Sequence, residues 1–471
     1  MEETNTPNHS LYKFIDNLNG KLGHTCCFEE LKQELLSANE DSKKIYNIKI
    51  KEDAKLCLIY YDNESSLNEF EFGMRSCIIE KETMKIIATQ FNKIIYNEDA
   101  KEFFNKNNDI TKMVIQPCYE GTMILLFYHN DRWYISTRRC LDASTSKWIP
   151  NYSYKDLFDD IIDGKLNINT LNKNYCYHFI LIHHKNLNIV NFNAKYKDTY
   201  FDKMRLQIND NKYKELIHVL TTEKYTLNEI NYDIPLTKKI SKLEYETIND
   251  VYRDLVLISE LDKKDNVIRL EGFIIKYYND DNTFNVLKLQ TDIYKYITEQ
   301  KNNSNTLEQS YYSMYQKNTL KTCIPFFTKH IAQTIKRIDI CMKTLTDELL
   351  TIYHMTKKHK NKDFYEVLPK IFRKIVYDIH GLYINKKNKE PIIYRDVFTY
   401  LKSINSKILF LIIKERQNII GYLKNLDKQK LYNIIGNIIY LTKKNKIKDR
   451  YMIGPFHLGI SDMVLSYKLM F

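Results

Sequence analysis

The segment Val114–Ala143, V-I-Q-P-C-Y-E-G-T-M-I-L-L-F-Y-H-N-D-R-W-Y-I-S-T-R-R-C-L-D-A, decides the predicted fold. Two hydrophobic runs, Met123–Tyr128 and Trp133–Thr137, flank the polar tetrapeptide H-N-D-R. Apolar runs rich in β-branched and aromatic residues predict strands, and Asn and Asp between them favour a tight turn. We therefore predict a β-hairpin. An acid–glycine pair, Glu120–Gly121, precedes the hairpin, and a basic pair, Arg138–Arg139, follows it.

Residues 45–300 are rich in predicted strands. Apolar and β-branched residues cluster there between Asn, Asp and Gly turns. Besides the hairpin, we predict strands at Ala54–Tyr61, Ser76–Glu80, Lys85–Gln90, Val114–Ile115, Tyr177–His183, Asn188–Asn191, Val267–Tyr278 and Phe284–Gln290. Helices are predicted at Tyr154–Asp163 and Asn249–Leu261. The sequence thus predicts an α+β domain built around antiparallel sheet, preceded by a short helical segment over residues 1–44.

The hydrophobic period changes to 3.6 beyond a polar stretch, 301–310, which we interpret as a linker. Helices are predicted at Ile331–Lys343, Leu345–His359, Phe364–Ile379, Tyr394–Lys402, Ile408–Leu423 and Lys430–Leu441, punctuated by Gly381 and Pro391. Residues 311–471 therefore form a predicted all-helical domain. Residues 301–471 hold 31 Lys and Arg against 13 Asp and Glu, while the rest of the chain has 40 against 46. This asymmetry favours contact with a polyanion, nucleic acid above all, although a solvated lysine-rich surface has the same composition.

Six short segments in chain order carry a family resemblance. They are F-G-M-R-S-C-I-I-E with Arg75, F-N-K-I-I-Y-N-E from Phe91 to Glu98, C-Y-E-G at 118–121, C-Y-H-F-I-L-I-H-H-K-N-L-N-I-V, E-G-F-I-I-K from Glu271, and L-K-L-Q-T-D-I-Y with Lys288. Together they resemble the covalent nucleotidyltransferases, and most of all the phage-type RNA ligases and the ligase-like proteins of giant viruses. The resemblance covers roughly residues 70–300 and implies an ATP-grasp-like ligase domain, with ATP and Mg²⁺ as cofactors.

The first of that family's motifs, Lys-x-Asp/Glu-Gly, has lost its lysine here. The family's lysine amine attacks the α-phosphate of a nucleoside triphosphate, and Cys118 stands at its position. A thiolate is a good nucleophile, but the cysteine side chain is three bonds shorter, a shortfall of roughly 3–4 Å. A misplacement of about 1 Å can cost about 10²-fold in rate. Lys112 lies six residues earlier, before Pro117, and would need another path to the phosphate.

Two further departures weaken the predicted site. Ile180 stands where active ligases place a glutamate, and Gln290 replaces the second lysine of the closing motif. The resemblance still assigns phosphate or nucleotide contacts to four residues, Arg75, Glu120, Lys288 and Arg138, and a metal-associated acid to Glu271. Of the site's expected residues, the nucleophile and part of the phosphate-binding charge are missing.

Other residues admit two interpretations each. Arg138–Arg139 could grip a phosphate, or one of them could pair with Asp142. Trp133, Tyr134 and Trp148 could stack on bases or could belong to the core. His183–His184 could suggest a metal site, but neighbouring strand residues face opposite sides and no acid lies at ligand spacing. The run Lys443–Arg450 could bind nucleic-acid phosphates or form a solvated loop.

The cellular compartment of the protein is predicted from the absence of membrane and secretion signals in its sequence. No apolar run approaches the ~20 residues of a membrane span, and the acidic start M-E-E-T-N-T lacks the order of a signal peptide. Nine cysteines without a C-x-x-C motif favour free thiols. We expect an intracellular protein with no membrane partner, located, as the viral resemblance implies, in infected-cell cytoplasm or the virion.

Three functions remain open from the sequence. The first is a degenerate ligase-like protein that binds RNA or another nucleic acid. The second is an active RNA ligase or capping-type transferase with a displaced nucleophile. The third is a viral structural or scaffolding protein that reuses the fold. The sequence does not identify protein partners.

Overall fold

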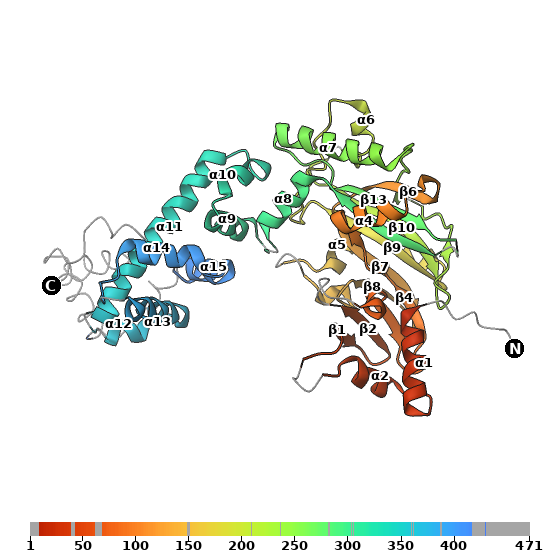
Figure 1. The fold of residues 1–471 in the computed structure, drawn as a ribbon, viewed down its shortest axis with the longest axis horizontal. Helices are drawn as coiled ribbons and strands as arrows, with labels where there is room; N and C mark the ends of the chain where they lie inside the picture. The colour runs from red at the N-terminus through yellow and green to blue at the C-terminus, as the bar shows by residue number, and fades with distance from the viewer. Residues whose placement is uncertain are drawn as a thin grey trace. The chain divides into compact units, whose positions relative to one another are not determined.

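The computed structural model describes residues 9–38, 43–61, 68–147, 151–208, 210–235, 237–280, 283–302, 304, 306–358, 360, 362–386, 389–416 and 429. The chain divides into two compact units, Met1–Thr298 and Glu299–Phe471, and helix α8 (Asp292–Lys301) crosses the division. The first unit holds all strands that the structure describes, and the described residues of the second fold as helices and turns (Figure 1).

Three sheets form the first unit. The N-terminal sheet has the order β1-β2-β3-β4, the central sheet β11-β10-β9-β7-β8 with β12 beside β10, and the outer sheet β5-β14-β13-β6. The strands are β1 (Ile48–Glu52), β2 (Leu56–Tyr61), β3 (Cys77–Glu80), β4 (Ile86–Thr89), β5 (Ile95–Tyr96), β6 (Met113–Cys118), β7 (Thr122–His129), β8 (Arg132–Thr137), β9 (Tyr175–His183), β10 (Lys214–Glu223), β11 (Glu229–Ile230), β12 (Lys238–Lys239), β13 (Gly272–Tyr278) and β14 (Phe284–Gln290). Only β10–β12 and β14–β5 pair in parallel among the described strands. The predicted α+β class with antiparallel sheet is confirmed.

The predicted hairpin forms as β7 and β8, paired from Ile124–Thr137 to His129–Arg132. Asn130 and Asp131 occupy the two central turn positions with φ of 47° and 60°. Positive φ at both positions is the geometry of a type I′ turn, whose twist matches that of the flanking strands. Asn and Asp tolerate this region better than other non-glycine residues, and this explains why the polar tetrapeptide ends one strand and begins the next.

Separate apolar clusters hold the layers of the first unit together. Helices α1 and α2 cover one face of the N-terminal sheet, and the other face packs against β7, β8 and Cys176 of β9. Helix α5 covers the opposite face of the central sheet, and α4 and α7 cover the outer sheet. The helices are α1 (Ser10–Leu22), α2 (Phe28–Leu35), α3 (Glu69–Phe72), α4 (Asn97–Lys106), α5 (Tyr154–Ile162), α6 (Thr199–Asp202) and α7 (Ile248–Asp265), with short 3-10 turns η1 (Ile110–Lys112), η2 (Ala143–Thr145) and η3 (Ile168–Thr170).

Helices of the second unit pack around α11. The elements are α9 (Leu307–Gln316), α10 (Leu320–Cys323), η4 (Ile324–Phe326), α11 (Ile331–Tyr353), the π-helix η5 (His354–Lys358), α12 (Lys362–Val367), α13 (Lys370–Asn385), α14 (Tyr394–Ser403) and α15 (Ser406–Glu415). A buried pair joins α11 to the end of α15: Arg416 Nε and Nη2 lie 2.5 and 2.7 Å from the two carboxylate oxygens of Glu348. None of the helices in the described residues has the length and hydrophobicity to cross a bilayer.

Two strand predictions in the first unit were wrong. Asn188–Asn191 is not a strand, because the backbone N–H groups of Ile189 and Val190 donate to the Glu120 carboxylate. The predicted strand Val267–Tyr278 begins only at Gly272. The N–H of Arg269 donates to Asp262 on α7 at 3.0 Å, and this bond keeps the preceding residues against the helix.

Helix boundaries in the second unit also differ from the predictions. Ile331–Lys343 and the start of Leu345–His359 form one helix, α11, since the Thr344 hydroxyl donates to the Ile340 carbonyl and does not interrupt it. The predicted helix Phe364–Ile379 is divided by Pro369, which has no N–H and precedes α13. Gly381 lies inside α13. The predicted helix Lys430–Leu441 and the run Lys443–Arg450 lie outside the described residues.

Candidate functional site

The register of the outer sheet brings three of the predicted motifs together. Gly272 on β13 pairs with Cys118 on β6 and with Gln290 on β14. Because side chains alternate along a strand, Lys288, two residues before Gln290, shares its face of the sheet with Cys118. Residue 118 and residues 271 and 288, which follow it by more than 150 positions in the chain, therefore meet at one end of this sheet.

Only glycine fits at position 272. Its φ is 153°, and a Cβ there would lie 2.0 Å from the Leu289 carbonyl oxygen and 2.8 Å from the Gln290 Cα. The neighbouring backbone cannot shift without breaking the pairing with β14. The E-G dipeptide thus has a structural requirement here: the glycine lets three strands close up, and Glu271 enters the site immediately before it.

Glu271 is the centre of a buried polar cluster. Its Oε1 lies 2.6 Å from the Lys288 ammonium and accepts a hydrogen bond of 2.9 Å from the Gln290 amide, and the Cys118 thiol donates to its Oε2 at 3.6 Å. The Asn97 amide, at the start of α4, donates to Gln290 Oε1 at 3.0 Å. We call Cys118, Glu271, Lys288, Gln290 and Asn97 the Glu271 cluster.

The electrostatics of the cluster disfavour a nucleophile. Burial, reinforced by the Glu271 carboxylate, raises the pKa of the Cys118 thiol to about 12, so it carries its proton at neutral pH. Burial opposes the charge of Lys288, but the neighbouring Cys118 and Glu271 outweigh burial and raise the pKa of the ammonium. A neutral thiol and a protonated lysine are both poor nucleophiles.

Glu120 lies in the turn between β6 and β7 and holds a loop. Its Oε2 accepts from the N–H groups of Ile189 and Val190 at 2.6 and 2.7 Å. The buried Tyr294 hydroxyl on α8 has its pKa raised by burial and also by the charges of Glu120 and Glu271. Both acids therefore influence the same phenol.

Arg75 and Arg138 lie apart from the Glu271 cluster. The Arg138 guanidinium stacks over the Tyr61 ring at 4.6 Å. Arg75 Nη1 is buried and has no hydrogen-bond partner among the described residues. Arg75 precedes β3 and Arg138 follows β8, so these two predicted phosphate-binding residues come from other sheets than Glu271 and Lys288.

The residues fit the two implied cofactors unequally. The buried, unpartnered N–H of Arg75 suits an oxyanion, which would be a nucleotide phosphate. Magnesium fits poorly, because the Lys288 ammonium already neutralises Glu271. In the described part of the chain, no three His, Cys, Asp or Glu side chains come together as a metal site. We derive no step through a metal.

The other candidate residues have mostly structural surroundings. Tyr134 is buried and stacks on Phe127 with ring centroids 5.1 Å apart, while Trp133 packs half-buried against the α5 cluster. His183 pairs with Asp160 at 2.8 Å, and Lys112 pairs with Asp280 at 2.6 Å. Trp148 lies outside the described residues.

Sequence reasoning missed Asn97 and a cavity beside the cluster. Asn97 lies in the segment F-N-K-I-I-Y-N-E, but no sequence pattern pointed to it. Its φ of 41° is visible only in the structure. The cavity, about 450 Å³, is lined mainly by β10, β13 and the segment 229–242, and no motif marked that segment.

Comparison with known proteins gives distant relatives. No family model matches the chain. An "Immediate-early protein ICP-46 homolog" of Invertebrate iridescent virus 3 is 32% identical over 112 residues, 22% of this chain and 25% of that protein. A protein of the same description from Invertebrate iridescent virus 6 is 24% identical over 350 residues, 70% of this chain and 68% of that protein. The match thus spans only about a quarter of the first relative.

Among solved structures, similar chains are ATP-dependent ligases. A putative ATP-dependent DNA ligase from Aquifex aeolicus has a TM-score of 0.33 at 12% identity, over 73% of this chain and 86% of that one. An archaeal ATP-dependent RNA ligase has a TM-score of 0.32 at 10% identity, over 88% and 90%.

Proposed function

We propose that this chain is an RNA-ligase-like protein that binds nucleic acid and does not form a covalent nucleotidyl intermediate. The main observation that supports this proposal is the Glu271 cluster. Its residues come from three of the segments on which the resemblance stands, C-Y-E-G, E-G-F-I-I-K and L-K-L-Q. At its centre a protonated Cys118 thiol occupies the position at which the family's chemistry needs a neutral amine.

Lys288 is the ammonium nearest to that position, and its surroundings argue against a catalytic role. Its pair with Glu271 is buried, and the amide of Gln290 occupies the same carboxylate oxygen. To attack a phosphate, the amine would have to lose both its proton and this partner. The alternative of an active ligase with a displaced nucleophile therefore requires a rearranged cluster.

Nucleic-acid binding is supported by the charge of the second unit. Exposed cations follow its helices, such as Lys336 and Arg337 on α11 and Lys370 and Lys374 on α13. A basic surface of this kind attracts a polyanion by releasing counterions, so we expect binding to fall steeply with salt. RNA is the expected ligand, with ATP as a reversible one, and the distant viral relatives favour action inside an infected cell.

Covalent labelling tests the proposal. The full chain is incubated with α-labelled ATP or GTP and Mg²⁺ and then separated under denaturing conditions. We expect no protein-bound label in the wild type or in Cys118→Ala and Lys288→Ala. A labelled wild-type band that disappears in either variant would overturn the proposal and would name the nucleophile.

A second measurement separates nucleic-acid binding from scaffolding. Binding of single-stranded RNA to the full chain should weaken strongly between 50 and 200 mM salt, roughly 300-fold if six phosphates are contacted. The double variant Lys336→Glu, Arg337→Glu should bind more weakly, whereas Lys32→Glu on α2 of the first unit is the control. Salt-insensitive binding, or none, would favour the scaffolding role.

A further inference from the structure

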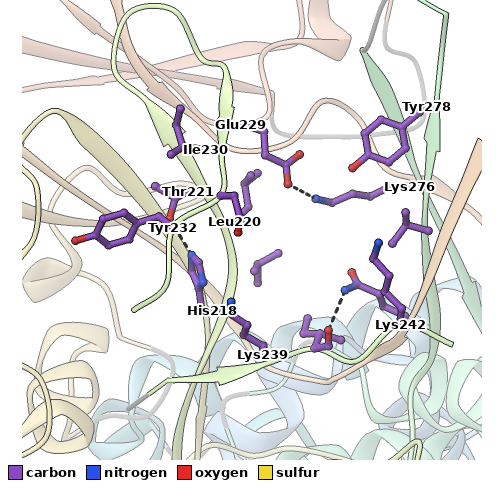
Figure 2. A pocket seen from close by; sticks show the side chains of 15 residues that line it. His218, Leu220, Thr221, Glu229, Ile230, Tyr232, Lys239, Lys242, Lys276 and Tyr278 are labelled. Carbon is purple, nitrogen blue, oxygen red and sulfur yellow. Dashed lines mark hydrogen bonds and ion pairs between the residues drawn. The ribbon is translucent and has the colours of Figure 1, made fainter. Parts of the chain in front are cut away.

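A cavity opens between the central and outer sheets, beside the Glu271 cluster but not lined by any of its residues. Figure 2 shows the side chains that line it, which come from β10, β11, β12 and β13 among other segments, with Glu229 and Lys276 facing each other across it. Its volume of about 450 Å³ lies within the roughly 300–1,000 Å³ typical of small-ligand pockets. On the outer sheet the wall is formed by Val114 and Gln116 of β6 and by Lys276 and Tyr278 of β13.

Three lysines face this cavity. Lys276 is bound at 3.2 Å by Glu229, and Lys239 at 2.7 Å by Asp233, which is 83% exposed. Lys242 is exposed and makes no ion pair among the residues that the structure describes. Because both carboxylates reach solvent, an incoming oxyanion can replace them without leaving a buried acid unpaired. The cavity thus offers exchangeable positive charge.

Neutral polar and aromatic groups complete the lining. Burial lowers the pKa of His218 to about 4, so its imidazole is neutral and bonds to the Thr221 hydroxyl at 2.9 Å. The Gln116 amide donates to the Ile240 carbonyl at 3.2 Å. Tyr278 adds a half-buried ring, whereas the Tyr232 ring packs against Tyr175 and Tyr177 with centroids 5.5 and 5.7 Å apart. Hydrogen-bonding amides and imidazoles suit the edges of a base, and tyrosine rings suit its faces.

We propose that this cavity binds a phosphorylated nucleotide, either free or as the end of an RNA chain, with the phosphate on Lys239 and Lys242 and the base beside Gln116 and Tyr278. The proposal rests on the proposed nucleic-acid function and adds to it a discrete site in the first unit. The lining contains neither Cys118 nor Lys288, so occupancy requires no covalent chemistry.

The test compares phosphorylated and unphosphorylated probes on the full chain. Titration calorimetry measures AMP and adenosine, and fluorescence anisotropy measures a short RNA with a 5′-phosphate or a 5′-hydroxyl. Lys239→Ala and Lys242→Ala should each weaken binding of the phosphorylated probe about tenfold, the loss expected for one charge-assisted hydrogen bond. The unphosphorylated probes should change little.

A matched control lies on the same strand. Lys238 neighbours Lys239 on β12 but pairs with Glu215 at 2.8 Å and does not line the cavity. Lys238→Ala removes the same charge and should leave the affinity unchanged. An equal loss in Lys238→Ala, or no loss in Lys239→Ala and Lys242→Ala, would overturn the proposal. If the two variants lose affinity for AMP, the ligand is a free nucleotide. If they lose affinity only for the 5′-phosphorylated RNA, the ligand is the end of an RNA chain.

The outcome is separable from that of the proposed function. Covalent labelling at Cys118 or Lys288 would show that the protein is nucleotidylated and would overturn the proposed function. The effect of Lys239→Ala and Lys242→Ala on AMP affinity is measured independently of that result.

Discussion

Two lysines on one face of the outer sheet, Lys288 and Lys276, each pair with a glutamate, and the two pairs differ in what surrounds them. Lys288 and Glu271 are 2.6 Å apart, and the glutamate is only 5% exposed. Lys276 and Glu229 are 3.2 Å apart, and the glutamate is 41% exposed. In the first pair, Gln290 and Cys118 occupy the rest of the carboxylate. Lysine and glutamate therefore form a buried structural pair at the Glu271 cluster. At the cavity they form a pair in which a ligand oxyanion could replace the glutamate.

The largest effect should come from breaking the closed pair. Glu271→Gln leaves the Lys288 ammonium buried without a counter-charge, and such a loss typically costs about 3–5 kcal/mol of unfolding free energy. Glu229→Gln should cost less, because that carboxylate is 41% exposed and lies 3.2 Å from Lys276, a longer pair than that of Glu271 with Lys288. Urea denaturation followed by circular dichroism measures both.

The control for this prediction removes both charges. In Glu271→Leu with Lys288→Met, no unpaired ion remains, and most of the stability should return. Equal losses in Glu271→Gln and Glu229→Gln would show that burial does not distinguish the two pairs.

The pH dependence of stability should sharpen the comparison next. The folded-state pKa of Cys118 is about 12, against an ordinary value of 9.0. A group whose folded pKa is raised stabilises the protein fully below its unfolded pKa, so this contribution is lost as pH rises from about 9 towards 12. Unfolding free energy measured between pH 8 and 10.5 should therefore fall more steeply in the wild type than in Cys118→Ala.

An exposed thiol provides the reference for that measurement. Cys27→Ala should retain the wild-type slope, since Cys27 is exposed. Identical slopes in the wild type and Cys118→Ala would contradict a buried, protonated thiol beside Glu271.

A smaller effect is expected on ligand affinity at the open pair. Glu229→Gln frees Lys276 for an oxyanion, so AMP should bind about two- to fivefold more tightly, a gain within the ~1 kcal/mol of partly exposed ion pairs. Glu215→Gln, whose partner Lys238 lies outside the cavity, is the control. Weaker AMP binding in Glu229→Gln would mean that the carboxylate itself contacts the ligand.

The smallest effect should be at Asp233. Its pair with Lys239 is almost fully in solvent, so Asp233→Asn should change the unfolding free energy by less than about 0.5 kcal/mol. Differential scanning calorimetry of both proteins in one buffer checks this, and a large shift in the melting temperature would show a structural role for the pair.

The sequence predicted the parts of this fold that local pattern determines. The hairpin could be read from the alternation and the Asn130–Asp131 turn, and α5 from its apolar spacing. Strand β10, Lys214–Glu223, was missed because buried polar residues such as His218 and Thr221 interrupt its apolar pattern. The strand predicted at Asn188–Asn191 failed because a carboxylate 69 residues earlier, Glu120, takes its N–H groups.

Some members of the Glu271 cluster could be predicted from the sequence, and its bonds could not. The motif resemblance named Cys118, Glu271 and Lys288, and strand register brings them together. The spacing could not show that Lys288 pairs with Glu271, since that depends on side-chain burial. The cavity with Lys239, Lys242 and Lys276 is lined partly by residues 229–242, which resemble no known motif. Nothing in the neighbouring sequence distinguishes these lysines from the many others in the chain.

The double pairing of Gly272 bears on how readily amine chemistry could be regained. A lysine introduced at position 118 would start from the strand beside Gly272 and would bring a second ammonium to a carboxylate that already has one. Introducing lysine at this single position should therefore yield repulsion and lower stability rather than a labelled protein. To accommodate an amine at position 118, the cluster would need changes at 118 and 288 together. The labelling and urea assays can test this by comparing Cys118→Lys with the double variant Cys118→Lys, Lys288→Met.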